Sequence, residues 1–365
     1  MNTGAPSLAR SASASRAWVI SLGLGLLLSG LLPVPAWGQE PAASAAKATE
    51  EETGQDVEYA RMVKAIFADD GIADIRVIFG YDNTKDFRDA NDPGRAARFM
   101  KYLKAQGYEE HKPSEHAAAV LGVPVDAPNL RVLAGKNKQG RILRIALMWS
   151  SLSDSGARNI GVGYTDQLKR SEEAMNFMKK ACAEAEVMMY VGHSRGGGGP
   201  DTYPPEIRPS KGSEMVTDFS YYRKNRPGMQ ALAPYLEKAE ATPKLVAWTS
   251  CLSDVHFRKW FGDRCARKLH ATGVVLSTRL TSYTPWKDEV MGYDEGVMVA
   301  LAVIEALQYG RDGAQLREDL LGCEMEELRV AKPAWKLTML PGLPLQPHPQ
   351  PVAMPFATPA VAAGQ

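Results

Sequence analysis

Two short stretches of the chain contain side chains able to act as nucleophiles or bases. The first is GHSRG at residues 192–196, which matches the G-x-S-x-G pattern around the nucleophilic serine of α/β-hydrolases. The second is TSC at residues 249–251, which ends an apolar run with a thiol. Either Ser194 is a nucleophile, or His193 acts as the base for Cys251, and the two possibilities imply different enzymes.

The serine alternative requires a strand, a strained turn and a helix that begins directly after the serine. An apolar run at residues 187–191 predicts the strand, but four glycines at 196–199 and then Pro200 follow. Each glycine costs a helix about 1 kcal/mol relative to alanine, and an internal proline costs about 3 kcal/mol. The segment is therefore predicted to be a loop, one that could close over a substrate or simply be flexible. His256 and His270, the downstream histidine candidates, lie in or at the end of a predicted helix, so the serine hydrolase is the weaker alternative.

Short apolar segments alternate with segments of helical periodicity through the middle of the chain. The predicted strands cover residues 75–81, 130–134, 142–149, 187–191, 245–250 and 273–277. The predicted helices lie around residues 57–67, 97–107, 166–184, 227–240, 254–269 and 289–307. Such alternation is typical of βαβ units, and the sequence therefore predicts an α/β fold with a mostly parallel sheet and helices on both faces.

Right-handed crossovers bring the carboxyl ends of parallel strands to one edge of a sheet, where open α/β sheets bind ligands. His193 follows one predicted strand and Cys251 follows the next, so we expect the two side chains to be neighbours. An imidazole beside a thiol promotes the nucleophilic thiolate and can later protonate a leaving amine. The backbone around Gly192 and Ser194 is expected to donate N–H groups to an oxyanion, and Ser250 also lies next to this site.

This pattern of strand–His, about 50 residues, and strand–small–Cys resembles the caspase-like cysteine peptidases, the group that includes caspases, gingipains and legumains. The stretches YVGHSRGGGGPD and LVAWTSCLSD are also similar to exported bacterial proteins of this fold that have no assigned substrate. The resemblance covers residues 72–310 in architecture. It implies a caspase-like α/β/α sandwich in which His193 is the general base and acid and Cys251 attacks a peptide carbonyl.

This chain departs from the family at two positions. Ser194 stands where glycine usually follows the histidine, and Ser250 stands where alanine or glutamine is common before the cysteine. These departures leave open an enzyme with weak or lost activity. A non-catalytic exported protein that uses the same sheet edge to bind a peptide or protein is therefore a further alternative.

Two acidic residues near strand ends are weaker candidates. Asp201 and Asp254 could orient the histidine or select a basic substrate side chain, but a solvated loop acid or a helix-cap acid is the expected alternative for each. Ser253 and Asp254 together resemble an N-cap for the helix that follows. The sequence contains no HExxH, CxxC or P-loop pattern, so neither a metal nor a nucleotide cofactor is predicted.

The N-terminus has the pattern of a secretory signal peptide. Arg10 and Arg16 precede an apolar run at residues 17–32, and a small-x-small sequence ends at Gly38. The run has 16 residues and is short for a membrane-spanning helix. Residues 1–38 are therefore predicted to be cleaved, which places the mature chain in the periplasm or outside the cell without stable membrane insertion.

The rest of the chain divides by composition into a spacer at 39–55, one domain at 56–339 and a Pro-rich unpacked tail at 340–365. Loss of the signal peptide with its two arginines changes the formal charge from +1 to −1. A near-neutral protein offers no basic field for nucleic acid, so a peptide or protein substrate is the expected partner. Four cysteines in so long a chain do not form a disulfide scaffold, and the sequence leaves their pairing open.

Overall fold

The computed structural model describes residues 42–83, 89–210, 214–238, 243–268, 270–281, 294–324 and 333–341, with the backbone alone for residues 42–52. The chain divides into two units, Met1–Ala46 and Lys47–Gln365, and the fold below is that of the second unit. The predicted signal peptide at 1–38 and most of the predicted tail at 340–365 lie outside the described residues.

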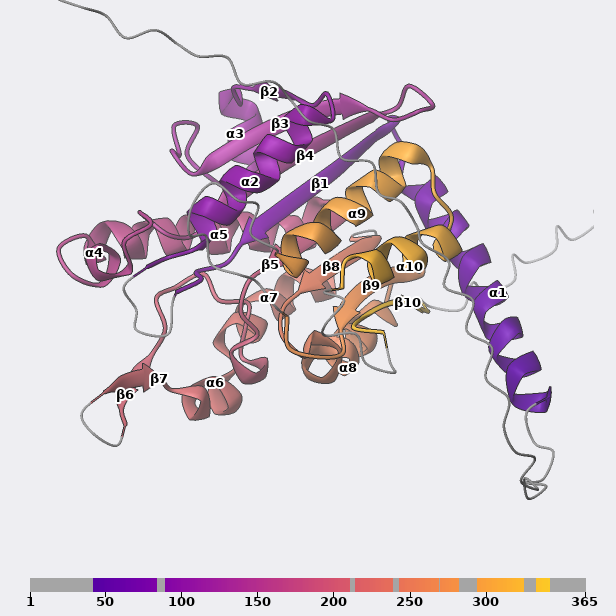
Figure 1. Ribbon diagram of the computed structural model, residues 1–365. Helices are drawn as coiled ribbons and strands as arrows, with labels where there is room; N and C mark the ends of the chain where they lie inside the picture. The colour runs from indigo at the N-terminus through magenta and orange to yellow at the C-terminus, as the bar shows by residue number, and fades with distance from the viewer. Residues whose placement is uncertain are drawn as a thin grey trace, which may run out of the picture. The chain divides into compact units, whose positions relative to one another are not determined.

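An eight-stranded sheet forms the centre of the described part of the chain, with the strand order β10-β9-β8-β5-β1-β4-β3-β2 (Figure 1). The parallel strands are β4 (Ile142–Trp149), β1 (Ile72–Phe79), β5 (Val187–Val191), β8 (Leu245–Thr249) and β9 (Thr272–Ser277). Antiparallel strands complete the sheet at its edges: β3 (Leu130–Lys136) and β2 (Glu109–His111) at one, β10 (Trp335–Leu340) at the other. The short strands β6 (Ile207–Pro209) and β7 (Met215–Thr217) form a separate hairpin.

Helices cover both faces of the sheet, as predicted. The side chains packed on one face come from α1 (Ala42–Ile66), α2 (Asp92–Ala105), α9 (Glu295–Tyr309) and α10 (Gly313–Gly322). The other face is covered by α3 (Glu115–Leu121), α5 (Tyr164–Glu184), α7 (Pro227–Lys238) and α8 (Ser253–Cys265). The connections after β4 and β5 contain α4 (Gly156–Ile160), a single 3₁₀ turn η1 (Arg195–Gly197) and α6 (Phe219–Asn225). The predicted α/β class with a mostly parallel sheet is confirmed.

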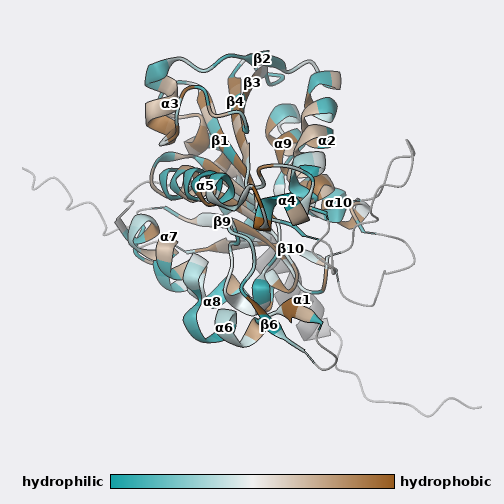
Figure 2. Cartoon of the chain, turned by 90° about the vertical axis from the view of Figure 1, so that its left-hand side faces the viewer, coloured by the Kyte–Doolittle hydropathy of each residue, from teal (hydrophilic) through white to brown (hydrophobic). Residues whose placement is uncertain are grey.

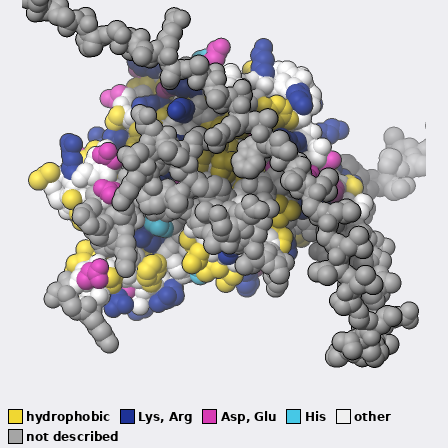
Figure 3. All heavy atoms as spheres, viewed as in Figure 1, with side chains coloured by type: hydrophobic (Ala, Val, Ile, Leu, Met, Phe, Trp, Pro, Cys, Tyr) yellow, Lys and Arg dark blue, Asp and Glu magenta, His cyan; other side chains and the backbone are white. Residues whose placement is uncertain are grey.

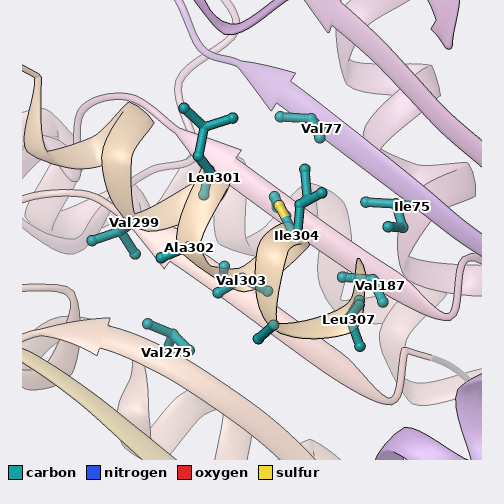
Figure 4. Close-up of a cluster of buried hydrophobic side chains, with 14 of the residues drawn as sticks. Ile75, Val77, Val187, Val275, Val299, Leu301, Ala302, Val303, Ile304 and Leu307 are labelled. Atoms are coloured by element: carbon teal, nitrogen blue, oxygen red, sulfur yellow. The ribbon is translucent and has the colours of Figure 1, made fainter. Parts of the chain in front are cut away.

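Burial on both faces explains why the central strands are continuous apolar runs. All five residues of β5 are buried: Val187, Met189 and Val191 belong to one core cluster, and Met188 and Tyr190 to the other. Figure 4 shows the first cluster, where side chains of α9 lie against those of the central strands. Figure 2 shows hydrophilic residues on the outer side of α5, as expected for a helix with only one face in the core.

Two secondary-structure elements extend across the boundaries predicted by composition. The helix α1 begins at Ala42, so most of the predicted spacer at 39–55 is helical and continues into the predicted helix at 57–67. An Ala- and Glu-rich segment has high helix propensity, which outweighs its lack of an apolar stripe once the helix is anchored further along. At the other end, Leu340 is the last residue of β10, so the expected tail begins one residue too early.

The order of the parallel strands places a topological switch between β1 and β5. The chain passes from β1 to β4 on one side and then returns through α5 to β5 on the other side of β1. Connections after β1 and β5 therefore leave in opposite directions, and ligand sites of open α/β sheets lie outside the carboxyl ends of such strands.

Acidic and basic side chains lie interspersed on the described surface in Figure 3. Within the same described residues, no helix has both the length and the apolar character that crossing a bilayer requires.

Candidate functional site

The register of β5 and β8 brings His193 and Cys251 to the same edge of the sheet. Val191 pairs with Thr249 in this parallel ladder, and each of the two candidate residues follows two positions after its member of the pair. Adjacent parallel strands lie about 4.8 Å apart, so the two backbone positions are close. The expected placement on neighbouring strand ends is confirmed.

Cys251 occupies a sharp turn between a strand and a helix. The strand β8 ends at Thr249 and α8 begins at Ser253, while Leu252 between them has a left-handed backbone with φ of 53°. A branched side chain rarely adopts this conformation, and such strain costs about 1–3 kcal/mol. The geometry that a nucleophile elbow requires is therefore present at Cys251, next to a helix N-terminus that favours negative charge.

The other thiols of the chain are enclosed. Cys182, Cys265 and Cys323 are buried, whereas Cys251 is partly exposed, and all four are free thiols. Burial raises the pKa of Cys182 and of Cys323 to about 12, which keeps both in the unreactive thiol form. Cys251 is thus the cysteine that a substrate or reagent can reach.

Ser194 lacks the helix that a serine nucleophile needs. The residues after it form only the 3₁₀ turn η1, in which Arg195, Gly196 and Gly197 all have positive φ. The predicted interruption of the helix is confirmed. A Cβ at Gly198 would lie 2.7 Å from Tyr222, so Gly198 is required for this close packing.

An acidic residue that the sequence analysis missed supports His193. The Nε2 atom of His193 lies 2.7 Å from Oδ1 of Asp82, whose side chain is only 1% exposed. Burial disfavours the Asp82 carboxylate, but the nearby His193, Arg95 and Arg195 outweigh it and hold the pKa of Asp82 well below its usual range. Asp82 follows the buried strand β1, which pairs with β5, and its position after an apolar run is the signal that could have identified it.

The Tyr190 side chain fixes the backbone of His193. The Tyr190 hydroxyl donates a 2.9 Å hydrogen bond to the His193 carbonyl and accepts one of 2.9 Å from the Asp201 N–H. Two glycines leave room for this hydroxyl, because a Cβ at Gly80 or Gly192 would lie 2.5 or 2.6 Å from its oxygen. Gly192 is therefore required for packing.

The expected oxyanion donors are only partly available. The Gly192 N–H donates to the Thr249 carbonyl at 3.4 Å, so this member of the predicted set is already engaged. The N–H groups of His193, Ser194 and Cys251 have no acceptor among the described residues. Ser250 is fully buried, with its N–H bonded to the Trp248 carbonyl, and its hydroxyl has no partner there.

The two weaker candidates have structural partners. Asp201 is 4% exposed and forms a buried ion pair with Arg195, so the expectation of a solvated loop acid is wrong and no exposed carboxylate remains for a substrate. Asp254 lies in the first turn of α8 and accepts a 2.6 Å hydrogen bond from Arg258. The predicted N-cap at Ser253 is also wrong: this serine is the first helical residue, and its hydroxyl accepts the Ser277 N–H at 2.6 Å.

A second buried carboxylate joins the loops after β1 and β4. Asp92 accepts the N–H groups of Ser150 at 3.0 Å and Ser151 at 2.7 Å, and that of Asp82 at 3.3 Å. Burial raises the pKa of Asp92 to about 7 despite these hydrogen bonds. The loop that contains Asp82 is therefore fixed by the first residue of α2.

The thiol and the imidazole have different polar neighbours. The Cys251 sulfur lies 3.2 Å from the Thr281 hydroxyl, and His193 pairs with Asp82 rather than with the thiol. Catalytic hydrogen bonds are often unformed without substrate, so this arrangement is compatible with a dyad. In the described residues, no group of His, Cys, Asp and Glu is arranged to hold a metal ion.

Comparisons with family models, curated proteins and solved structures find no match to this chain. The functional assignment therefore depends on the site geometry and on the family resemblance of the two short stretches.

Proposed function

We propose that this protein is an exported caspase-like cysteine peptidase in which Cys251 is the nucleophile, His193 the general base and acid, and Asp82 the residue that orients the imidazole. The observation that carries the proposal is the shared edge of β5 and β8, which ends in a histidine on one strand and a partly exposed cysteine elbow on the next. The family resemblance implies the same order of residues on consecutive strands.

The contact between His193 and Asp82 supports one route for the proton. Because Nε2 faces the Asp82 carboxylate, Nε2 carries the hydrogen in the neutral ring and Nδ1 remains free to accept a proton. His193 takes the Cys251 proton, and the thiolate sulfur forms a bond to the peptide carbonyl carbon. The imidazolium then protonates the leaving amine as the C–N bond breaks.

A water molecule completes the cycle. His193 removes a proton from the water as its oxygen attacks the thioester carbonyl, and the C–S bond breaks to return the thiol and release a carboxylate. The N–H groups of Cys251, His193 and Ser194, which have no acceptor within the described part of the chain, are the donors for the oxyanion in both halves of the reaction.

Thiol labelling tests the assignment of the nucleophile. Iodoacetamide should modify Cys251 in the folded protein well before the three buried cysteines, and His193→Gln should slow that modification. The mature chain should then cleave members of a mixed peptide library, and Cys251→Ala should abolish cleavage. Equal labelling of Cys251 in the His193→Gln variant, together with an uncleaved library, would reject the peptidase.

One observation favours a second candidate, a non-catalytic binding protein that uses the same sheet edge. The Cys251 sulfur is hydrogen-bonded to Thr281 and not to His193, as in a site that retains the fold but not the reaction. In that case the library would contain peptides that bind without cleavage and that bind equally well to Cys251→Ala. The serine hydrolase has no support in the turn after Ser194, and the absence of fluorophosphonate labelling on that serine would confirm this.

A further inference from the structure

A buried chain of charges extends from His193 to the start of α9. The second oxygen of Asp82, Oδ2, accepts a 2.8 Å hydrogen bond from Nη1 of Arg95. Arg95 then donates from Nε and Nη2 to the two carboxylate oxygens of Asp294, at 2.7 and 2.8 Å. Arg95 is 5% exposed and Asp294 4% exposed, so the chain is enclosed by protein.

Packing fixes Arg95 in this position. Asp294 is the N-cap of α9, where its Oδ1 also accepts the Val297 N–H at 3.1 Å. A Cβ at Gly296 would lie 2.9 Å from Nη2 of Arg95 and 3.2 Å from the Thr249 hydroxyl, so the first turn of α9 closes over the guanidinium. Two parallel hydrogen bonds to one carboxylate also define the plane of the guanidinium.

The cations and anions around Asp82 come from several elements. Arg95 and Asp92 face it from α2, His193 from the end of β5, and Arg195 from η1. Arg195 is already paired with Asp201, and Arg95 alone of the two arginines makes a direct hydrogen bond to Asp82.

The proposed reaction needs a permanent cation at this place. His193 must be neutral to accept a proton, and in that state it contributes no charge to stabilise the buried Asp82 carboxylate. An isolated buried carboxylate would take up a proton instead, and it could then no longer stabilise the imidazolium. An arginine stays charged at all relevant pH values, so it can stabilise Asp82 in both protonation states of His193.

We infer that Arg95, anchored by Asp294, is a positioning residue that keeps Asp82 ionised and oriented while His193 alternates between its neutral and protonated forms. The inference rests on the proposed function for its catalytic meaning. The ionisation of Asp82 can be measured without any substrate.

The test follows the His193 ring by NMR as the pH is lowered. His193→Gln identifies its resonances among those of the six histidines of the chain. Ionisation of Asp82 produces an acid inflection in the ring shifts. In Arg95→Met this inflection should move upward by about 1–3 pH units, because an adjacent cation lowers a carboxyl pKa by that amount. Arg95→Lys keeps the charge, so in this variant the inflection should stay close to its wild-type pH.

Two further variants make the result decisive. Arg76→Met is the matched control, because Arg76 is 1% exposed and forms a 2.9 Å bond to Asp74 but has no contact with the His193 site. Arg95→Gln loses the charge but keeps an amide donor, and it replaces Arg95→Met if that variant does not fold.

An unmoved inflection in a folded Arg95→Met or Arg95→Gln protein would overturn the inference, as would an equal shift in Arg76→Met. Failure of the peptidase proposal gives a different result. The wild-type protein then cleaves no peptide, while the Asp82 inflection still moves on loss of Arg95.

Discussion

Replacement of Asp82 by asparagine removes one charge from the site while it preserves shape. The side-chain carbonyl of asparagine can still accept the Nε2 hydrogen of His193, and Arg95 keeps its two bonds to Asp294. The Arg95 hydrogen bond to Oδ2 of Asp82 is lost, because an amide NH2 takes the place of that oxygen. Oppositely charged groups about 4 Å apart interact by about 4 kcal/mol at an effective dielectric constant of 20. In the proposed reaction this interaction arises only after His193 has taken the thiol proton, so it stabilises the charged intermediate more than the resting site.

The lost interaction free energy can be expressed as a fold-change in kcat. At about 1.4 kcal/mol per factor of ten, about 4 kcal/mol corresponds to about 10³-fold in kcat. The His193 side chain is 29% exposed, and solvent screening reduces the effect, so we expect a loss of about 10²- to 10³-fold.

The assay is steady-state cleavage of a peptide selected from the library, with kcat and KM measured separately for wild type and Asp82→Asn. KM should change little, because Asp82 is 1% exposed and cannot contact substrate. Asp74→Asn is the matched control, since Asp74 is a buried acid of β1, the strand that Asp82 follows, and is paired with Arg76. A folded Asp82→Asn enzyme within threefold of wild-type kcat, or an equal loss in Asp74→Asn, would refute the role of Asp82.

Three other perturbations test the packing that supports the site. Asp201→Ala leaves Arg195 buried without its partner and should lower the free energy of unfolding by about 3–5 kcal/mol in urea; a loss below about 1 kcal/mol would contradict the pairing. Gly228→Ala places a Cβ 2.1 Å from a backbone oxygen and should lower the free energy of unfolding by about 1–3 kcal/mol or more. Gly262→Ala, with open space around it in α8, should raise the free energy of unfolding by about 0.5–1 kcal/mol, and equal effects of the two variants would refute the contact at Gly228. Burial raises the pKa of Asp92 to about 7, so the folded state binds its proton more tightly than the unfolded state, and the free energy of unfolding should fall as pH rises from about 4 to 7. Asp92→Asn should remove that part of the slope, and an unchanged slope in urea titrations would exclude it.

The central strands could be predicted because burial on both faces leaves a strong sequence signal. The apolar run at 187–191 matches β5 at both ends, and the run at 142–149 matches β4. The edge strand β10 was missed, since Trp335–Leu340 alternates only weakly between buried and exposed residues beside a Pro-rich segment. Short elements such as α4 and α6 lack any periodicity of their own and depend on the loops that surround them.

The part of the candidate site that lies on consecutive strands could be predicted from sequence. The part that depends on the order of the strands in the sheet could not. His193 and Cys251 follow successive parallel strands of the sheet, and strands joined by one crossover are usually neighbours. Asp82 follows β1, a strand more than a hundred residues earlier, and the pairing of β1 with β5 appears only once the sheet order is known. The burial of Asp201 could not be predicted either, because the sequence does not distinguish a solvated loop aspartate from one that is buried in an ion pair.

The G-x-S-x-G match has a packing explanation that needs no serine chemistry. Gly192 is required because any Cβ there would collide with the Tyr190 hydroxyl, and Gly196 because its φ is 62°. Both glycines of the motif thus serve the turn that fixes the His193 backbone. The physical criteria behind the motif are a strand, a strained turn and a helix N-terminus, and the polar residue that meets all three is Cys251. Sequence pattern and elbow geometry therefore separate in this chain, and the proposed nucleophile is the residue with the elbow geometry.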